Sequence, residues 1–228
     1  MGELHLEIII SRMEREFNTR VNVGKPQVVY RETIGHPSEA TAVFDKEVAG
    51  QAHWGQVTVR LTPLARGSEN RVRSEVDAES ADLSAEAMEA VKKGILESLE
   101  SGTVMGYPVV DVDAVIVDIA QKETGASALA LRVGAAMACK ECLSKGGAFL
   151  LDPIMTVEIF VPEQFMGEVI GDLNARSGKV ENIENRAANM VIQAIVPLAK
   201  MFGYSTSLRS VTQGRGTFTM QFSHFDRA

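Results

Sequence analysis

The chain has 228 residues, of which 45% are hydrophobic, a length that allows two or three compact domains with their own cores. The formal net charge of -7 excludes broad, sequence-independent binding of nucleic acid, which requires an excess of lysine and arginine on the binding face. No apolar run approaches the roughly 18 residues that span a bilayer, and no signal peptide is apparent. We therefore expect a cytoplasmic protein with no membrane partner.

Cys139 and Cys142 form a C-x-x-C motif inside the Ala-rich segment 126–146, which predicts a helix. A redox pair favours a helix N-terminus, where the thiol pKa is lowered, and this motif does not lie at one. A zinc site would need further cysteines or paired histidines, which the sequence lacks. We interpret both cysteines as small apolar residues of a core helix, and expect no metal site in this chain.

The opening segment, 1–31, predicts an amphipathic helix followed by an extended stretch. Apolar residues recur at spacings of three and four through 3–17, namely Leu6, Ile9, Ile10, Met13 and Phe17. Strand-like sequence follows at 21–23 and 28–34, broken by Gly-Lys-Pro at 24–26. Because one helix and one strand cannot bury two faces, we interpret this segment as the end of a truncated domain.

The region 32–152 predicts an α+β domain with its helices on one side of a sheet. Strands are expected at 40–48, 53–63, 71–76 and 109–119. Ser84 can cap a helix that ends at Gly102, and the Ala-rich helix follows the last strand.

The region 153–228 predicts the order β-α-β-β-α-β. Strands are expected at 155–161, 179–185, 190–196 and 217–222, and helices at 165–176 and 198–208. This order is that of ferredoxin-like domains, in which two helices pack on one face of a four-stranded antiparallel sheet.

The motifs MGELHLE at 1–7, VGKPQVVYRET at 23–33 and GYPVVD at 106–111 resemble those of a translocation GTPase, bacterial elongation factor G. The first two are similar to the junction of that family's third and fourth domains, and the third is similar to its fourth domain. DPIM at 152–155, GEVIGDL at 167–173 and PLAKMFGYSTSLRS at 197–210 are similar to its fifth domain. The resemblance covers essentially the whole chain in the family's order.

The resemblance implies that 1–31 are the C-terminal part of domain III, 32–152 a domain IV with a ribosomal protein S5 domain 2-like fold, and 153–228 a ferredoxin-like domain V. It also implies an arm that contacts ribosomal RNA, ribosomal proteins and the tRNA–mRNA complex. Such an arm promotes translocation after GTP hydrolysis by an N-terminal G domain of the same protein. Because the phosphate-binding G-x-x-x-x-G-K-[ST] loop is absent from this chain, we expect GTP and magnesium only in the full-length parent.

The resemblance places two loops at the tip of domain IV, beside the decoding region. In the first, 47–56, Gly50, Gln51, His53 and Trp54 are the candidate RNA contacts. Glycine allows close approach of the backbone, and tryptophan can stack on a splayed base. The alternative is an ordinary hairpin turn with Trp54 half-buried against the sheet.

In the second tip loop, 119–125, the candidates are Gln121, Lys122 and Glu123. Lys122 falls where many family members carry histidine, and it offers a phosphate a permanent charge. Alternatively, it is solvated surface. Because both loops depart from the family pattern, a paralogue acting in ribosome recycling stays open as an alternative. A second alternative is a free-standing ribosome-binding module without GTPase activity.

Basic side chains of domain V are candidate contacts to ribosomal RNA, since phosphate binding needs such charges together with backbone donors. They are Arg176, Lys179, Arg186, Lys200, Arg209 and Arg215. The alternative for most of them is plain surface. No pairing of acidic residues with a nucleophile or metal site is apparent, so we expect no catalytic residue in this chain.

Overall fold

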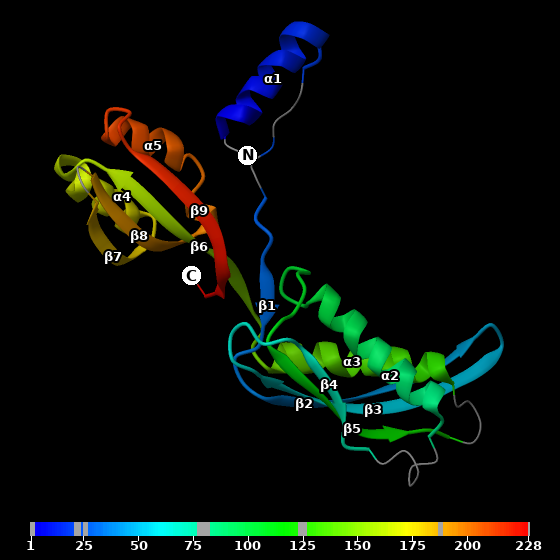
Figure 1. Cartoon of the computed structure of the whole chain (residues 1–228). Coiled ribbons are helices and arrows are strands. Elements are labelled where there is room, and N and C mark those ends of the chain that lie inside the picture. Colours follow the sequence, from blue (N-terminus) through cyan, green and yellow to red (C-terminus); the bar gives the residue numbers. More distant parts are fainter. Residues whose placement is uncertain are drawn as a thin grey trace. The chain divides into compact units, whose positions relative to one another are not determined.

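The computed structural model describes residues 3–20, 24, 27–76, 83–122, 127–186 and 189–227 (Figure 1). The chain forms two compact units, one of residues 30–151 with 225–227 and one of the remaining residues. No helix within the described ranges has the length and apolar character that crossing a membrane requires.

Helix α1 spans Glu3–Phe17, as the apolar spacing predicts. It ends where Asn18 adopts a φ of 48°, a left-handed conformation that asparagine tolerates at helix ends. The predicted strand-like residues 21–23, and residues 25 and 26 of the predicted break, lie outside the described residues. Of the extended segment 28–34, only β1, Arg31–Thr33, forms a strand.

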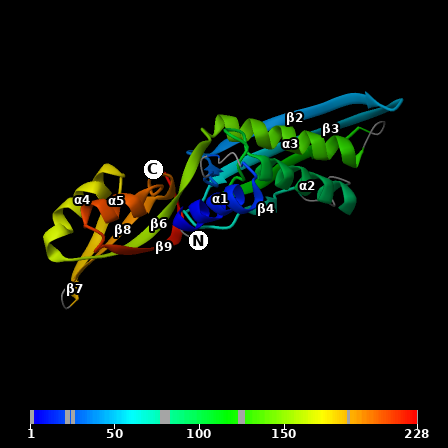
Figure 2. The same ribbon diagram turned by 90° about the horizontal axis from the view of Figure 1, so that it is seen from above.

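Residues 30–151 form a two-layer α+β domain, which confirms the fold class predicted for this region. Its strands are β2 (Ser38–Val48), β3 (Gln51–Pro63), β4 (Arg71–Ser74) and β5 (Val112–Ala120). They form a four-stranded sheet in the order β2-β3-β5-β4, in which only β4 and β5 pair in parallel. Helices α2 (Ala85–Ser101) and α3 (Ala128–Lys145) lie side by side over one face (Figure 1 and Figure 2).

The boundaries of α2 follow from its sequence. Ser84 caps its N-terminus by accepting a hydrogen bond from the N–H of Ala87 at 3.1 Å, and Gly102 ends it with a φ of 52°. Both features were predicted. One face of α2 is buried through Val91, Ile95 and Leu99. These residues pack in the core with alternate residues of β3, namely Val57, Val59 and Leu61.

Helices α2 and α3 approach each other closely at Gly94. A Cβ atom at this position would lie 2.1 Å from the carbonyl oxygen of Arg132 and 3.2 Å from the Cβ of Ala135. Since a backbone oxygen cannot move aside as a flexible side chain can, the contact requires glycine here.

Gly94→Ala is expected to lower the free energy of unfolding by about 2 kcal/mol, because the two helices must separate to admit the methyl group. Gly134→Ala in α3 is the matched control, since its Cβ would meet nothing closer than 3.6 Å. That variant should be neutral or up to about 1 kcal/mol more stable through helix propensity. Urea denaturation monitored by circular dichroism measures both, and equal effects would contradict the packing argument.

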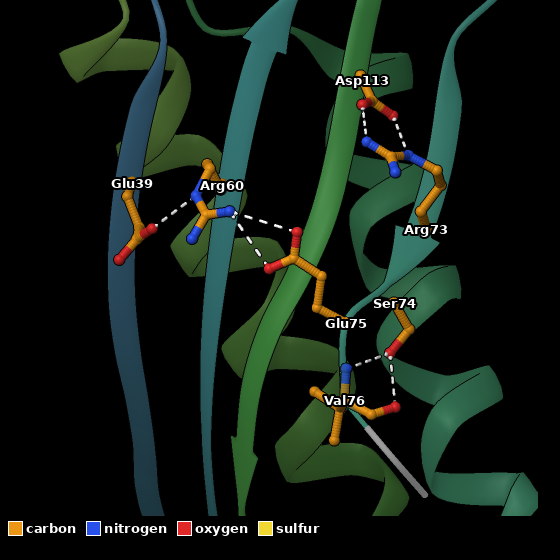
Figure 3. Close-up of polar contacts among 7 residues, drawn as sticks. All are labelled: Glu39, Arg60, Arg73, Ser74, Glu75, Val76 and Asp113. Carbon is orange, nitrogen blue, oxygen red and sulfur yellow. Dashed lines mark hydrogen bonds and ion pairs between the residues drawn. The ribbon is translucent and has the colours of Figure 1, made fainter.

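The sheet face opposite the helices carries a polar network (Figure 3). Arg60 of β3 lies between two carboxylates: its Nε donates to Glu39 Oε2 at 2.8 Å and its Nη1 to Glu75 Oε2 at 3.3 Å. Arg73 of β4 forms a bidentate pair with Asp113 of β5. The hydrogen bonds from Arg73 hold the pKa of the nearly buried Asp113 below its usual 3.8. The network thus links strands that are distant in sequence.

The base of this domain is built around the fully buried side chain of Glu32 in β1. Its carboxylate accepts hydrogen bonds of 2.6–3.1 Å from the backbone N–H groups of residues 103–107. Burial opposes ionisation, but the hydrogen bonds outweigh it and hold the pKa of Glu32 below its ordinary 4.5. The loop adopts this shape around Gly102 and Gly106, which have φ values of 52° and 84°.

Glu32→Gln is expected to lower the free energy of unfolding by about 3 kcal/mol at pH 7, because the amide places a donor against backbone donors and removes the charge. The native pKa of Glu32 is depressed, so its carboxylate contributes fully above the unfolded value near 4.5 and loses this contribution as pH falls through the native pKa. The difference in the free energy of unfolding between wild type and Glu32→Gln should therefore become smaller below about pH 4.5.

Denaturant unfolding at several pH values measures this difference. Glu39→Gln is the control, because Glu39 is half exposed and should change stability little at any pH. A difference that stays constant from neutral to acidic pH would contradict the assignment of an ionised Glu32.

The second unit has the predicted ferredoxin-like fold. Its strands are β6 (Phe149–Val161), β7 (Lys179–Arg186), β8 (Asn189–Pro197) and β9 (Thr217–Asp226), in the order β9-β6-β8-β7. Helix α4 (Met166–Ala175) follows the short helix η1 (Glu163–Phe165), and its Val169 and Leu173 pack in the core. Both β6 and β9 are longer than predicted, and the N-terminal end of β6 also pairs with β1.

The prediction of a single helix over 198–208 is wrong. The structure has a short helix η2 (Leu198–Lys200) and a separate α5 (Tyr204–Val211). Gly203 lies between them with a φ of 75°, a left-handed conformation that interrupts the helix and that glycine adopts without steric cost.

Candidate nucleic-acid interface

The first predicted tip loop is a tight hairpin. Strands β2 and β3 pair from Ser38–Leu61 to Val48–Gln51, so only Ala49 and Gly50 form the turn. Both have positive φ, 52° and 78°, as in a type I′ turn. The predicted loop 47–56 was therefore too long, because strand pairing continues almost to the turn. Gln51, His53 and Trp54 belong to β3, and Trp54 is half-buried, as the hairpin alternative predicted.

Lys122 and Trp54 come from the two different predicted tip segments and lie against each other. The Nζ atom of Lys122 is 4.5 Å from the centroid of the Trp54 ring, a cation–π contact. The register explains the contact: Gln56 pairs with Ala120, so the chain leaving β5 continues past Trp54. Sequence reasoning named both residues but did not bring them together.

A second link joins the hairpin to α3. The Nδ1 atom of His53 lies 2.8 Å from Oγ of Ser127, and this hydroxyl also caps α3 by accepting from the N–H of Ala130 at 3.0 Å. Ser127 was not among the predicted site residues, although a serine preceding an Ala-rich helix is a recognisable N-cap signal. It therefore fixes the start of α3 to β3.

The other candidates at this end are Gln121 and Glu123. Gln121 lines a shallow hollow with Ser84 and Ser127. Glu123 lies outside the described residues. Lys46, which pairs with His53 across the hairpin, is an exposed cation that sequence reasoning missed, although a lysine one residue before the predicted loop was a usable signal. Asp45 and Glu47 flank it, so the tip is of mixed charge rather than broadly basic.

Two of the predicted cations of the ferredoxin-like unit are held by other groups of the same unit. Arg176 donates to Asp172 at 3.0 Å and to the carbonyl oxygen of Lys200 at 2.6 Å, and its guanidinium lies over the ring of Tyr204. It thereby fastens the end of α4 to the segment before α5. Arg186 pairs with Glu184 at 3.1 Å.

The other predicted cations of this unit are exposed and form no ion pair within the described residues. They are Lys179, Lys200, Arg209 and Arg215. Their charges are available to an external anion, whereas the charge of Arg176 is largely used inside the protein.

The C-x-x-C motif is part of the core, as predicted. Cys139 and Cys142 are free, fully buried thiols of α3, and the thiol of Cys142 donates to the carbonyl oxygen of Val59 at 3.0 Å. Burial raises the pKa of Cys139 to about 11 and that of Cys142 to about 12. Across the described ranges, no group of three or more His, Cys, Asp or Glu residues is arranged to hold a metal ion.

The native chain is expected to react negligibly with Ellman's reagent at pH 8, because both thiols are inaccessible and protonated there. The same chain unfolded in guanidinium chloride should release two equivalents of product, which provides the internal control. Rapid reaction of either thiol in the folded protein would contradict the core assignment.

Comparisons with known proteins agree with this architecture. The family model "Elongation factor G, domain IV" matches residues 26–147, and "Elongation factor G C-terminus" matches 149–228. A curated relative, "Elongation factor G 2" of Syntrophus aciditrophicus (strain SB), is 48% identical over 227 residues, which are 100% of this chain and 33% of the relative.

A crystal structure of a protein from Thermus thermophilus superimposes with a TM-score of 0.84 at 30% identity, covering 100% of this chain and 34% of that one. The chain thus spans about a third of the length of the proteins it matches. It belongs to the elongation factor G family, of which it carries domain IV and the C-terminal domain.

Proposed function

We propose that this chain is the ribosome-contacting arm of an elongation factor G-type GTPase that promotes movement of tRNA and mRNA. Residues 1–31 would end domain III, 32–152 form domain IV and 153–228 form domain V. The observation that carries the proposal is the match of two consecutive family models over almost the entire chain. The G domain of the full-length parent binds GTP and magnesium. The protein acts in the cytoplasm, where the ribosomes are.

The arm acts by position and charge and makes no covalent step. Domain IV is suited to transmit force because its sheet is covered by two helices, its open face is joined by ion pairs and its base is held by Glu32. At the tip, the ammonium group of Lys122 can meet an RNA phosphate as a point charge. Rotation of the GTPase half then becomes displacement of this tip, a rigid-body change.

In domain V, Lys179, Lys200, Arg209 and Arg215 are the proposed contacts to ribosomal RNA. Their exposure and the lack of ion pairs within the described part of the unit support this role. Arg176 and Arg186, which have internal partners, are weaker candidates.

A paralogue acting in ribosome recycling is the second candidate. A relative at 48% identity is named Elongation factor G 2, and this chain carries Lys122 where many family members carry histidine. Both features favour a function divided between two copies of the factor.

One experiment separates the two candidates. The full-length factor is compared with a form lacking these 228 residues, and mRNA movement is followed by toeprinting while subunit splitting is followed by light scattering. We expect GTP-dependent acceleration of movement by the full-length factor alone. Acceleration of splitting alone would support recycling, and acceleration of neither would contradict both candidates.

The proposed domain V contacts are tested by the salt dependence of ribosome binding. Replacing Arg209 and Arg215 by glutamine should reduce the salt dependence of ribosome binding by about 0.7 to 0.9 log units per log unit of salt for each lost phosphate contact. Arg186→Gln is the matched variant, because its guanidinium is paired with Glu184, and its salt dependence should match that of wild type.

A further inference from the structure

We propose that Trp54 positions Lys122: the indole face holds the ammonium group as a fixed point charge for an RNA phosphate, and the ring does not stack on a base. This inference rests on the proposed function, because it names the group of the domain IV tip that acts on RNA. It assigns the tryptophan a role through the lysine rather than a direct contact with nucleic acid.

The geometry of the pair carries the inference. Trp54 is half-buried within β3, where it pairs with Asp45 of β2, so the strand ladder fixes its backbone. Lys122 is exposed, and its Nζ lies 4.5 Å from the centre of that ring. The ammonium therefore covers one face of the indole, and a base cannot stack on that same face. A lysine already held in place also loses less rotamer freedom when it binds a phosphate.

Among the described residues, no carboxylate forms an ion pair with Lys122, although Asp45 lies opposite Trp54 in the hairpin. An aromatic face attracts the cation without cancelling its charge, whereas an aspartate in the same place would do so. The aromatic partner thus keeps the charge available to an external phosphate.

Described residues before and after Lys122 are linked to β3. Before it, Ala120 pairs with Gln56, and after it, Ser127 bonds to the ring of His53 at 2.8 Å. Both anchors lie on the strand that carries Trp54 itself. Trp54 thus lies on β3, and Lys122 follows two residues after the pairing of Ala120 with that strand, an arrangement that helps to pre-position the charge.

A double-mutant cycle in the full-length factor tests the inference. The apparent second-order rate constant of ribosome-dependent movement, or of splitting if that is the active reaction, is measured for Trp54→Leu, Lys122→Gln and the double variant. We expect losses of about threefold for Trp54→Leu and about fivefold for Lys122→Gln. The double variant should lose about fivefold, no more than Lys122→Gln alone, because without the lysine the ring has nothing to position.

Conservative variants sharpen the test. Trp54→Phe retains an aromatic face and should keep most of the activity, and Lys122→Arg retains the charge and should do likewise. Only a positioning role predicts rescue by phenylalanine that disappears in the Lys122→Gln background. Base stacking by Trp54 itself would instead give losses that multiply, to about fifteenfold in the double variant, and would overturn the inference.

A structural measurement on the 228-residue chain guards against misfolding. Trp54 is the only tryptophan, so the ring current on the side-chain protons of Lys122 reports the pair directly by NMR. These protons should resonate upfield of those of other lysines and return to ordinary shifts in Trp54→Leu, while the rest of the spectrum is retained. Ordinary shifts in the wild type would overturn the inference.

Different results contradict the proposed function and the positioning role of Trp54. An intact factor that accelerates neither movement nor splitting contradicts the proposed function. An active intact factor whose rate is unchanged by Lys122→Gln, or whose cycle is multiplicative, contradicts only the positioning role of Trp54.

Discussion

Consecutive backbone N–H groups of residues 103–107 converge on the two carboxylate oxygens of Glu32, in a place that solvent does not reach. The backbone of the same residue donates to the carbonyl of Pro108 and accepts from the N–H of Val110, and it pairs with Leu150 of β6. A single acidic residue thus holds together the strand entering domain IV, the loop that follows α2 and the strand leaving the domain. A buried charge is tolerated only when so fully hydrogen-bonded, and the geometry of the domain base follows from that requirement.

The sheet of domain IV extends from this base to the hairpin turn between β2 and β3, and the two helices cover one of its faces. Close packing of α2 on α3 at Gly94 and the ion pairs on the open sheet face stiffen the same layer structure from its two sides. The tip then needs few residues. The hairpin turn is tight, β5 pairs with β3 as far as Ala120, and the ammonium group of Lys122 lies on the ring of Trp54. Under the proposed function, this acidic chain would contact RNA through a positioned charge rather than through a large basic surface.

Much of the fold could be read from periodicity and capping signals. The bounds of α1, the cap of α2 at Ser84 and the βαββαβ order of the last region are local properties of the chain, and all were predicted correctly. The errors have local causes too. A single helix was expected over 198–208, but Gly203 adopts a left-handed conformation that interrupts it. The first tip loop was predicted too long, because a type I′ turn needs only two residues.

The sequence by itself determined the family, the order of the elements and the residue types at the tip, because these depend on spacing and motif. Only the tertiary structure decided how those residues are used. The register of β3 with β5 sets Lys122 on Trp54, the fold of the last unit brings Arg176 to the carbonyl oxygen of Lys200, and packing buries the thiol of Cys139. Each of these contacts joins residues through the packing of strands and helices on one another, and no local pattern in the sequence records the distance between them.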